Sequence, residues 1–225
     1  MTVMGIIDFV AHDPIAESIV VAHQGTDPDN ISCSRVSIRL VSRRRMVHNG
    51  FQKTFERTAD GVLSGVQKGL GANNVNKVIV TGHSLGAAIA VMDAMMLKEA
   101  LGSSVEITTT VFGLPEVVMR NGLTLLIKLC VKIPLIYLTR RTDGVALHDP
   151  VPILPPRLIG YQHPQGEIHI NAVDGNGDAT DIVACPGQEN ENYSEGNNIL
   201  LDHSVANHAG PYIDNISFGG DACPL

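Results

Sequence analysis

A serine flanked by glycines, between a strand pattern and a helix pattern, is the feature that most constrains the fold. Residues 77–80 form a short apolar run, and the chain continues as Gly82-His83-Ser84-Leu85-Gly86. Apolar side chains then recur at positions 85, 89, 92 and 96, which is helical spacing. A G-x-S-x-G turn between a strand and a helix is the setting that exposes a serine as a nucleophile. Glycine is needed on both sides because a side chain there would collide with neighbouring backbone.

A serine hydroxyl attacks a carbonyl only when a histidine takes its proton and a carboxylate orients that histidine. In an α/β-hydrolase fold these three residues follow the order serine, acid, histidine. The downstream acids considered are Asp143, Asp149 and Asp174. Asp149 is favoured because it follows a probable strand and opens a proline-rich loop, 149–156, whose backbone is rigid. The structural alternative for Asp149 is an ordinary Asp-Pro turn.

Four late histidines are candidates for the base: His163, His169, His203 and His208. His163 precedes a proline and His169 lies within a strand pattern, so both have plausible structural roles. His203 and His208 both lie in a polar tail rich in loop-forming residues. The residues themselves do not separate these last two.

The order of the remaining patterns predicts a single α/β domain over residues 1–225. Strands are predicted at 18–22, 77–80, 105–112, 133–139 and 167–170, with helices over 51–70 and from residue 85 onward. The first helix should end at Gly69 and Gly71, and the tail from Asp174 should be mainly loops. Alternating strands and helices favour a mostly parallel sheet with helices on both faces.

Composition excludes several classes of protein. The chain is 44% hydrophobic and 17% charged, which suits a folded core. Its net charge of −7 argues against a nucleic-acid partner. The four cysteines show no C-x-x-C spacing, so no zinc site and no other metal site is predicted. The longest apolar stretch, 123–138, is interrupted by charges and a proline, so no transmembrane segment is predicted. Residues 1–10 lack the basic start of a signal peptide.

Several separate motifs, in matching order over most of the chain, resemble the fungal class 3 lipases, most of all the secreted basidiomycete-type members. They are the runs at 21–26 (VAHQGT), 82–88 (GHSLGAA), 112–115 (FGLP), 149–152 (DPVP), 166–170 (GEIHI), 185–188 (CPGQ) and 208–212 (HAGPY).

The resemblance implies an α/β-hydrolase fold and a catalytic triad of Ser84, Asp149 and His208. It also implies an oxyanion hole made by Thr26 and the backbone N–H of Leu85. The implied activity is carboxylic-ester hydrolysis, with triacylglycerol as the expected substrate, without a cofactor. The substrate would be met at an oil–water interface by an extracellular, monomeric enzyme. Two alternatives stay open: a feruloyl or other aryl esterase, and a catalytically impaired, vestigial lipase-like protein.

The chain also departs from the family pattern. Family members carry several dozen residues before the first matching strand, so an N-terminally truncated domain is expected, with strand surface left exposed. Two blocks, 32–46 and 116–141, lose and regain the pattern abruptly, as a shifted reading frame or a retained intron would produce. The first block holds five arginines where the family has its lid, and we expect it to be mobile. The family cysteine expected near Tyr193 is absent, which leaves Cys185 without that partner.

Overall fold

The computed structural model describes residues 8–26, 47–119, 135–142, 145–155, 157–176, 178–187, 194 and 204–219. The strands are β1 (Asp8–Asp13), β2 (Ser18–His23), β3 (Lys77–His83), β4 (Glu106–Phe112), β5 (Val118–Met119), β6 (Leu135–Thr142), β7 (Val145–His148), β8 (Tyr161–Gln162), β9 (Glu167–Val173) and β10 (Ala179–Ala184). The helices are α1 (Asn49–Phe55), α2 (Ala59–Asn73) and α3 (Leu85–Leu101), and the short 3-10 helices η2 (Gly102–Ser104), η3 (Arg157–Ile159), η5 (Val205–Ala209) and η6 (Ile213–Asn215).

The described strands form an eight-stranded sheet in the order β1-β2-β3-β4-β6-β9-β10, with β7 added alongside β6. Neighbouring strands from β2 to β9 run parallel. The outer strands β1, β7 and β10 are antiparallel to their neighbours. The prediction of a mostly parallel sheet is therefore confirmed, and each of the five predicted strands exists. A separate pair, β5 and β8, lies beside the main sheet.

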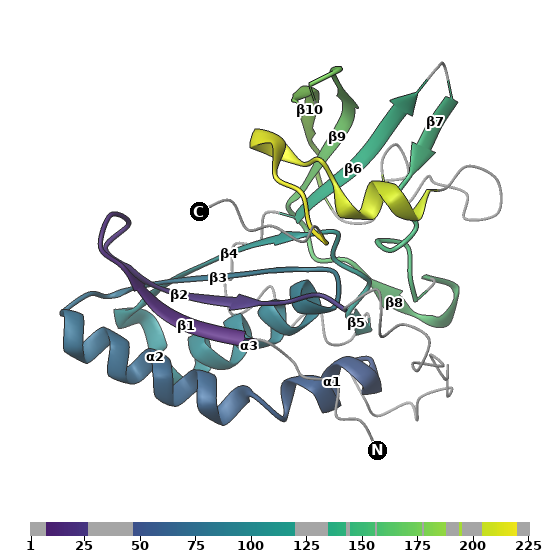
Figure 1. Ribbon diagram of the computed structural model, residues 1–225. Coiled ribbons are helices and arrows are strands. Elements are labelled where there is room, and N and C mark those ends of the chain that lie inside the picture. The colour runs from purple at the N-terminus through teal and green to yellow at the C-terminus, as the bar shows by residue number, and fades with distance from the viewer. Residues whose placement is uncertain are drawn as a thin grey trace.

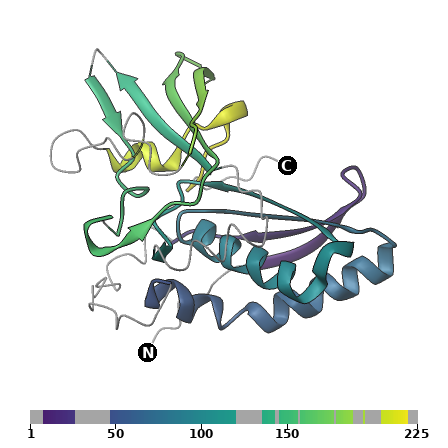
Figure 2. The same cartoon turned by 180° about the vertical axis from the view of Figure 1, so that it is seen from behind.

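The hydrophobic core lies between the first half of the sheet and the helices. Val21, Val78, Val80 and Val111 occupy alternate positions on their strands and are fully buried. Helix α2 contacts β1 and β2, and α3 contacts β2, β3 and β4. The sequence predicted helices on both faces, whereas the described α-helices α1, α2 and α3 all lie on one side of the sheet (Figures 1 and 2). The short helices η5 and η6 contact β6 and β10 instead.

Helix α3 is more deeply buried than its sequence pattern suggested. The spacing predicted one apolar stripe, but every residue from Gly86 to Ala94 is buried. Small side chains, among them Ala87, Ala88 and Ala90, allow this because they let strands and neighbouring helices approach closely. A helix packed on several sides is a rigid support for the serine at its N-terminus.

The predicted helix over 51–70 is two helices in the structure. Helix α1 ends at Phe55, and 3-10-type hydrogen bonds from the N–H groups of Arg57 and Thr58 close a turn before α2 begins. The predicted end at Gly69 and Gly71 is also wrong. Helix α2 continues to Asn73 and ends at Asn74 in the left-handed conformation. Gly69 serves packing, because an added Cβ would lie 2.8 Å from Ile19 Cδ1.

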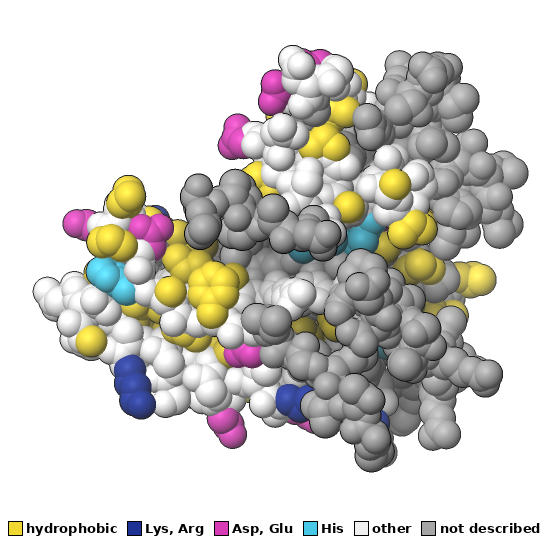
Figure 3. Space-filling view, viewed as in Figure 1, with side chains coloured by type: hydrophobic (Ala, Val, Ile, Leu, Met, Phe, Trp, Pro, Cys, Tyr) yellow, Lys and Arg dark blue, Asp and Glu magenta, His cyan; other side chains and the backbone are white. Residues whose placement is uncertain are grey.

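Two strands were missed at the ends of the sheet. Strand β1 pairs with β2 through a turn in which the Asp13 carboxylate accepts hydrogen bonds from two backbone N–H groups, those of Ile15 and Ala16. Strand β10 lies in the tail that was predicted to be mainly loops. Hydrophobic side chains gather on the surface over β1 and β2 (Figure 3), where Phe9 is 54% exposed and Ile15 95% exposed.

The two divergent blocks are only partly described. The arginine-rich block, 32–46, and its predicted mobility lie outside the described residues. In the second block, Val117 and Val118 are buried in the main core. Strand β6, also in that block, pairs with both β4 and β9. These parts of the second block are therefore integrated into the fold.

Candidate active site

Ser84 lies at a strained turn between β3 and α3. Its φ of 56° and ψ of −122° are unusual for a residue with a side chain. A hydrogen bond of 3.0 Å from the Ser84 N–H to the Phe112 carbonyl ties the turn to the end of β4. An added Cβ on Gly82 would lie 2.3 Å from the Gly86 carbonyl oxygen, and one on Gly86 would lie 2.3 Å from the His23 carbonyl oxygen. Both glycines are therefore sterically required.

The structure brings Asp149 and His208 together across 59 residues of sequence. His208 Nδ1 lies 2.8 Å from Asp149 Oδ2. The other carboxylate oxygen of Asp149 accepts a 2.9 Å hydrogen bond from the Val151 N–H, and the residue is 2% exposed. The carboxylate is thus held by the start of the proline-rich loop and oriented toward the imidazole.

The remaining candidates for acid and base lie elsewhere. Asp174 is exposed and accepts hydrogen bonds from backbone N–H groups of its own turn. His163 Nε2 donates to the Pro152 carbonyl at 2.5 Å, so it holds the loop that follows Asp149. His169 lies on β9 beside Glu167. Asp143 and His203 lie outside the described residues.

A glycine makes room for the His208 ring. Gly113 follows β4 and has a φ of +55°. An added Cβ there would lie 2.6 Å from His208 Cε1 and 2.9 Å from Tyr212 Oη. This glycine belongs to the 112–115 motif, and the structure shows that its role is to admit the imidazole. His208 Nε2 is buried and has no hydrogen-bond partner among the described residues. In a triad this nitrogen takes the serine proton, and such contacts often tighten only when substrate binds.

The loop that carries Thr26 lies against the serine turn. An added Cβ on Gly25 would lie 3.0 Å from the His83 carbonyl oxygen and 3.3 Å from Ser84 Cβ. Leu85 is the first residue of α3, where a backbone N–H has no acceptor within the helix. The two predicted oxyanion donors are thus on segments that flank Ser84.

A buried histidine and a buried aspartate are in contact at the base of this loop. His23 Nε2 and Asp93 Oδ2 are 2.5 Å apart, and both side chains are fully buried. Burial raises the pKa of Asp93 despite the nearby imidazole. The pair joins the end of β2, just before the Thr26 loop, to the middle of α3.

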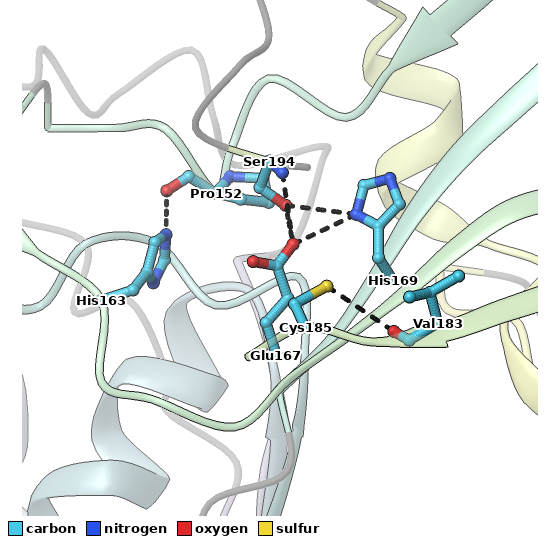
Figure 4. A network of polar contacts seen from close by, with 7 residues as sticks. All are labelled: Pro152, His163, Glu167, His169, Val183, Cys185 and Ser194. Atoms are coloured by element: carbon cyan, nitrogen blue, oxygen red, sulfur yellow. Dashed lines mark hydrogen bonds and ion pairs between the residues drawn. The ribbon is translucent and has the colours of Figure 1, made fainter. Parts of the chain in front are cut away.

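A second serine, histidine and carboxylate cluster lies on the other half of the sheet (Figure 4). Ser194 Oγ donates to Glu167 Oε1 at 2.6 Å, and His169 Nδ1 lies 3.1 Å from the same oxygen. Burial opposes ionisation of Glu167, but hydrogen bonds from His169 and Ser194 outweigh it and lower the Glu167 pKa. The hydroxyl proton is directed to the carboxylate, and Ser194 is 2% exposed. This cluster therefore anchors Ser194 to β9 and is not a nucleophilic site.

Cys185 lies beside this cluster and is free, which agrees with the absence of the family cysteine near Tyr193. Burial, together with the Glu167 carboxylate, raises the pKa of its thiol to about 12. The side chain is therefore an inert buried thiol. Among the described residues no group of three or more His, Cys, Asp or Glu side chains could hold a metal ion. No described helix is both long and apolar enough to cross a bilayer.

Two buried histidines make the fold sensitive to acid. Burial lowers the pKa of His163 to about 4, and burial and the adjacent His208 lower that of His83 to about 3. Between pH 6.5 and those values the unfolded chain binds protons that the folded chain does not, so stability is lost as the pH falls. We expect each histidine to reduce the free energy of unfolding by about 2 kcal/mol between pH 7 and pH 5.

Urea denaturation of the wild type and His163→Gln at pH 7 and pH 5 measures this contribution. Glutamine keeps an amide donor for the Pro152 carbonyl but does not titrate, so the variant should lose about half of the pH dependence assigned to the two histidines. Equal pH dependence in the two proteins would show that His163 does not contribute.

Comparison with known proteins places the chain in a family. The model of the lipase (class 3) family matches residues 20–159, which is more than half of the chain. A secreted mono- and diacylglycerol lipase of Malassezia globosa is 32% identical over 184 residues, covering 79% of this chain and 54% of the relative. A secreted mono- and diacylglycerol lipase of Malassezia restricta is 29% identical over 211 residues, covering 86% and 61%. The chain thus spans little more than half the length of these relatives.

The fold is also similar to those of solved lipase structures. The Rhizomucor miehei lipase in its propeptide complex superposes with a TM-score of 0.78 at 23% identity, covering 98% of this chain and 67% of that one. This agreement shows the α/β-hydrolase fold that the serine motif predicted. The match of the family model over residues 20–159 establishes that the chain belongs to the class 3 lipase family.

Proposed function

We propose that this chain hydrolyses the carboxylic esters of acylglycerols, with Ser84 as nucleophile, His208 as general base and Asp149 as the orienting acid. The observation that carries the proposal is the His208–Asp149 contact of 2.8 Å, formed beside a serine at a strained, glycine-flanked turn. Membership of a lipase family makes ester hydrolysis the reaction that this geometry serves.

The reaction proceeds through an acyl-enzyme. His208 Nε2 accepts the Ser84 proton while Ser84 Oγ attacks the ester carbonyl, and the resulting imidazolium is stabilised by the buried Asp149 carboxylate. The proton then passes from Nε2 to the departing glycerol oxygen. Water attacks the acyl-enzyme by the same route, with His208 again as the base, and releases the fatty acid.

Thr26 and the Leu85 N–H supply the oxyanion hole in this proposal. The negative charge that develops on the carbonyl oxygen lies at the N-terminus of α3, where the helix dipole is positive. Donors held in place before the reaction contribute a few kcal/mol each to transition-state stabilisation. The buried His23–Asp93 contact supports the strand end that leads into the Thr26 loop.

Exposed apolar side chains that lie close in sequence to Asp149 and His208 favour a lipid substrate. Val205 lies three residues before His208 in the sequence and is 67% exposed, and Leu158, in the short helix after the Asp149 loop, is 96% exposed. Exposed apolar groups of this kind suit contact with acyl chains. Two relatives are named as secreted mono- and diacylglycerol lipases. We therefore propose an extracellular enzyme that meets its substrate at a lipid surface, with partial acylglycerols as substrates in addition to triacylglycerol.

Hydrolysis of matched substrates tests the proposal. The purified chain is assayed on mono-, di- and tributyrin, on 4-nitrophenyl butyrate and on methyl ferulate. We expect the acylglycerols and the nitrophenyl ester to be cleaved, and an organophosphate to block cleavage by a single covalent addition on the peptide that contains Ser84. Cleavage of methyl ferulate alone would identify an aryl esterase, and neither cleavage nor labelling would identify a vestigial protein.

A further inference from the structure

The backbone carbonyl of His208 receives two side-chain donors. His83 Nε2 lies 2.6 Å from this oxygen, and Tyr212 Oη donates to it at 2.9 Å. Both donors bind the main chain of the proposed base and not its imidazole nitrogens. Asp149 holds the imidazole of His208 from its Nδ1 side. The base is therefore fixed at two places, its ring by Asp149 and its backbone by His83 and Tyr212.

The chemistry of both donors suits a permanent hydrogen bond. Because the acceptor is a carbonyl, His83 must carry its proton on Nε2. Burial and the adjacent His208 lower the pKa of His83 to about 3, so the ring stays neutral while His208 gains and loses a proton. Burial and the Asp149 carboxylate raise the pKa of Tyr212 well above its usual value, so its hydroxyl proton is retained.

The His83 ring is clamped by its neighbours. It stacks on Phe218 with a centroid distance of 4.2 Å and an interplanar angle of 6°. Its centroid lies 4.4 Å from that of the His208 ring. On another side, an added Cβ on Gly25 would lie 3.3 Å from His83 Nδ1. The ring thus contacts the loop before Thr26 as well as the base, and it has little freedom to rotate away.

His83 is also the residue directly before the nucleophile. It is the last residue of β3, and Ser84 begins the turn into α3. The contact with the His208 carbonyl spans 125 positions in the sequence, so it joins the nucleophile turn to the short helix η5 that carries the base. We propose that His83 is a positioning residue, which sets the distance between Ser84 and His208 by holding the backbone of the base. This inference rests on the proposed function of Ser84 and His208.

A positioning role has a measurable consequence. A displacement of about 1 Å between catalytic groups can reduce turnover by about 100-fold, because the reacting atoms no longer meet in the productive geometry. Substrate binding depends on other surfaces and should change little. Loss of the hydrogen bond should therefore lower kcat and leave KM nearly unchanged.

Two substitutions separate the hydrogen bond from the packing of the ring. His83→Phe keeps an aromatic ring between Phe218 and His208 but removes the donor, whereas His83→Gln keeps a donor near the position of Nε2 but removes the ring. We expect His83→Phe to lower kcat on 4-nitrophenyl butyrate by about tenfold to 100-fold with KM within about twofold. His83→Gln should recover a large part of that loss. His12→Phe, at an exposed histidine on the edge strand β1, is the matched control and should keep full activity.

Tyr212→Phe provides a second, independent measurement. It removes the other donor to the same carbonyl, and we expect the double variant with His83→Phe to lose more activity than the product of the two single losses. Thermal unfolding and circular dichroism of every variant establish that each is folded.

Each outcome of these measurements decides the inference. A His83→Phe protein with wild-type kcat would overturn the positioning role of His83. A His83→Gln protein that is no more active than His83→Phe would also overturn it. If His83→Phe fails to fold, the Tyr212→Phe kcat and the His83→Gln kcat decide in its place, and wild-type values for both would reject the role. A wild-type chain that cleaves no ester would instead refute the proposed function, which is a different result.

Discussion

Replacing Ser84 with alanine is expected to reduce the rate of ester hydrolysis by up to about 10⁶-fold. The substitution removes the hydroxyl oxygen that we propose forms the acyl-enzyme, and no other described side chain is placed to replace it. The strained backbone and its hydrogen bond to Phe112 remain, so the free energy of unfolding should change by less than about 1 kcal/mol. The measurement is the rate on 4-nitrophenyl butyrate, together with the loss of organophosphate labelling seen by intact mass.

Ser103→Ala is the matched control for this experiment. Ser103 is exposed and lies in η2, beyond the opposite end of α3. Its removal should leave both the rate and the labelling unchanged. A Ser84→Ala protein that retains activity within tenfold of the wild type would show that another residue is the nucleophile.

Substitution of the other two residues of the proposed triad should give the second-largest loss. Asp149→Asn and His208→Ala are each expected to lower kcat by about 10³-fold or more. The asparagine amide is neutral and can donate to Nδ1, so it favours the wrong tautomer of His208 and removes the charge that stabilises the imidazolium. Loss of His208 removes the base itself. The double variant should be only slightly less active than the worse single variant, because the two residues act as one unit.

The controls for this pair test the choice among candidates. Asp181 lies at an exposed position of β10, so Asp181→Asn should leave kcat unchanged. Asp143→Asn and His203→Ala alter the alternatives considered from the sequence, and we expect both to be nearly silent. A His203→Ala protein without activity, beside an active His208→Ala protein, would reverse the assignment of the base.

The strand, turn and helix around Ser84 could be predicted because their signals are local. A β-branched run, two glycines and an apolar helical repeat occur within one continuous segment, 77–101. Each signal acts through backbone conformation or through neighbouring side chains, so no distant contact is needed to interpret it. The same reasoning failed for the helix over 51–70, because its apolar spacing continues across a turn that is closed by backbone hydrogen bonds and by the Thr58 hydroxyl.

The outer strands β1 and β10 could not be predicted, because their own sequences carry only weak local signals. The sequence of β1, DFVAHD, has a charged residue at each end and little β-branched character, so its own propensity for a strand is weak. It forms because the turn at Asp13 brings it beside β2, where backbone hydrogen bonds are available. Strand β10 likewise forms by pairing with β9 inside a polar tail. In both cases the partner strand decides the outcome.

The sequence alone determined the fold class, the nucleophile turn and the family resemblance, since each depends on residue types at short, ordered spacings. Residue patterns did not separate His203 from His208, for which only the family resemblance favoured His208, nor did they assign a function to His83, Gly113 or Tyr212. The tertiary structure brought His208 to Asp149 and to the carbonyl-binding His83, contacts that span 59 and 125 positions. The strength of a hydrogen bond falls within a few ångströms of donor–acceptor distance and does not depend on separation in the sequence. For that reason only the folded chain, in which these distances are set, can show which histidine is held in place.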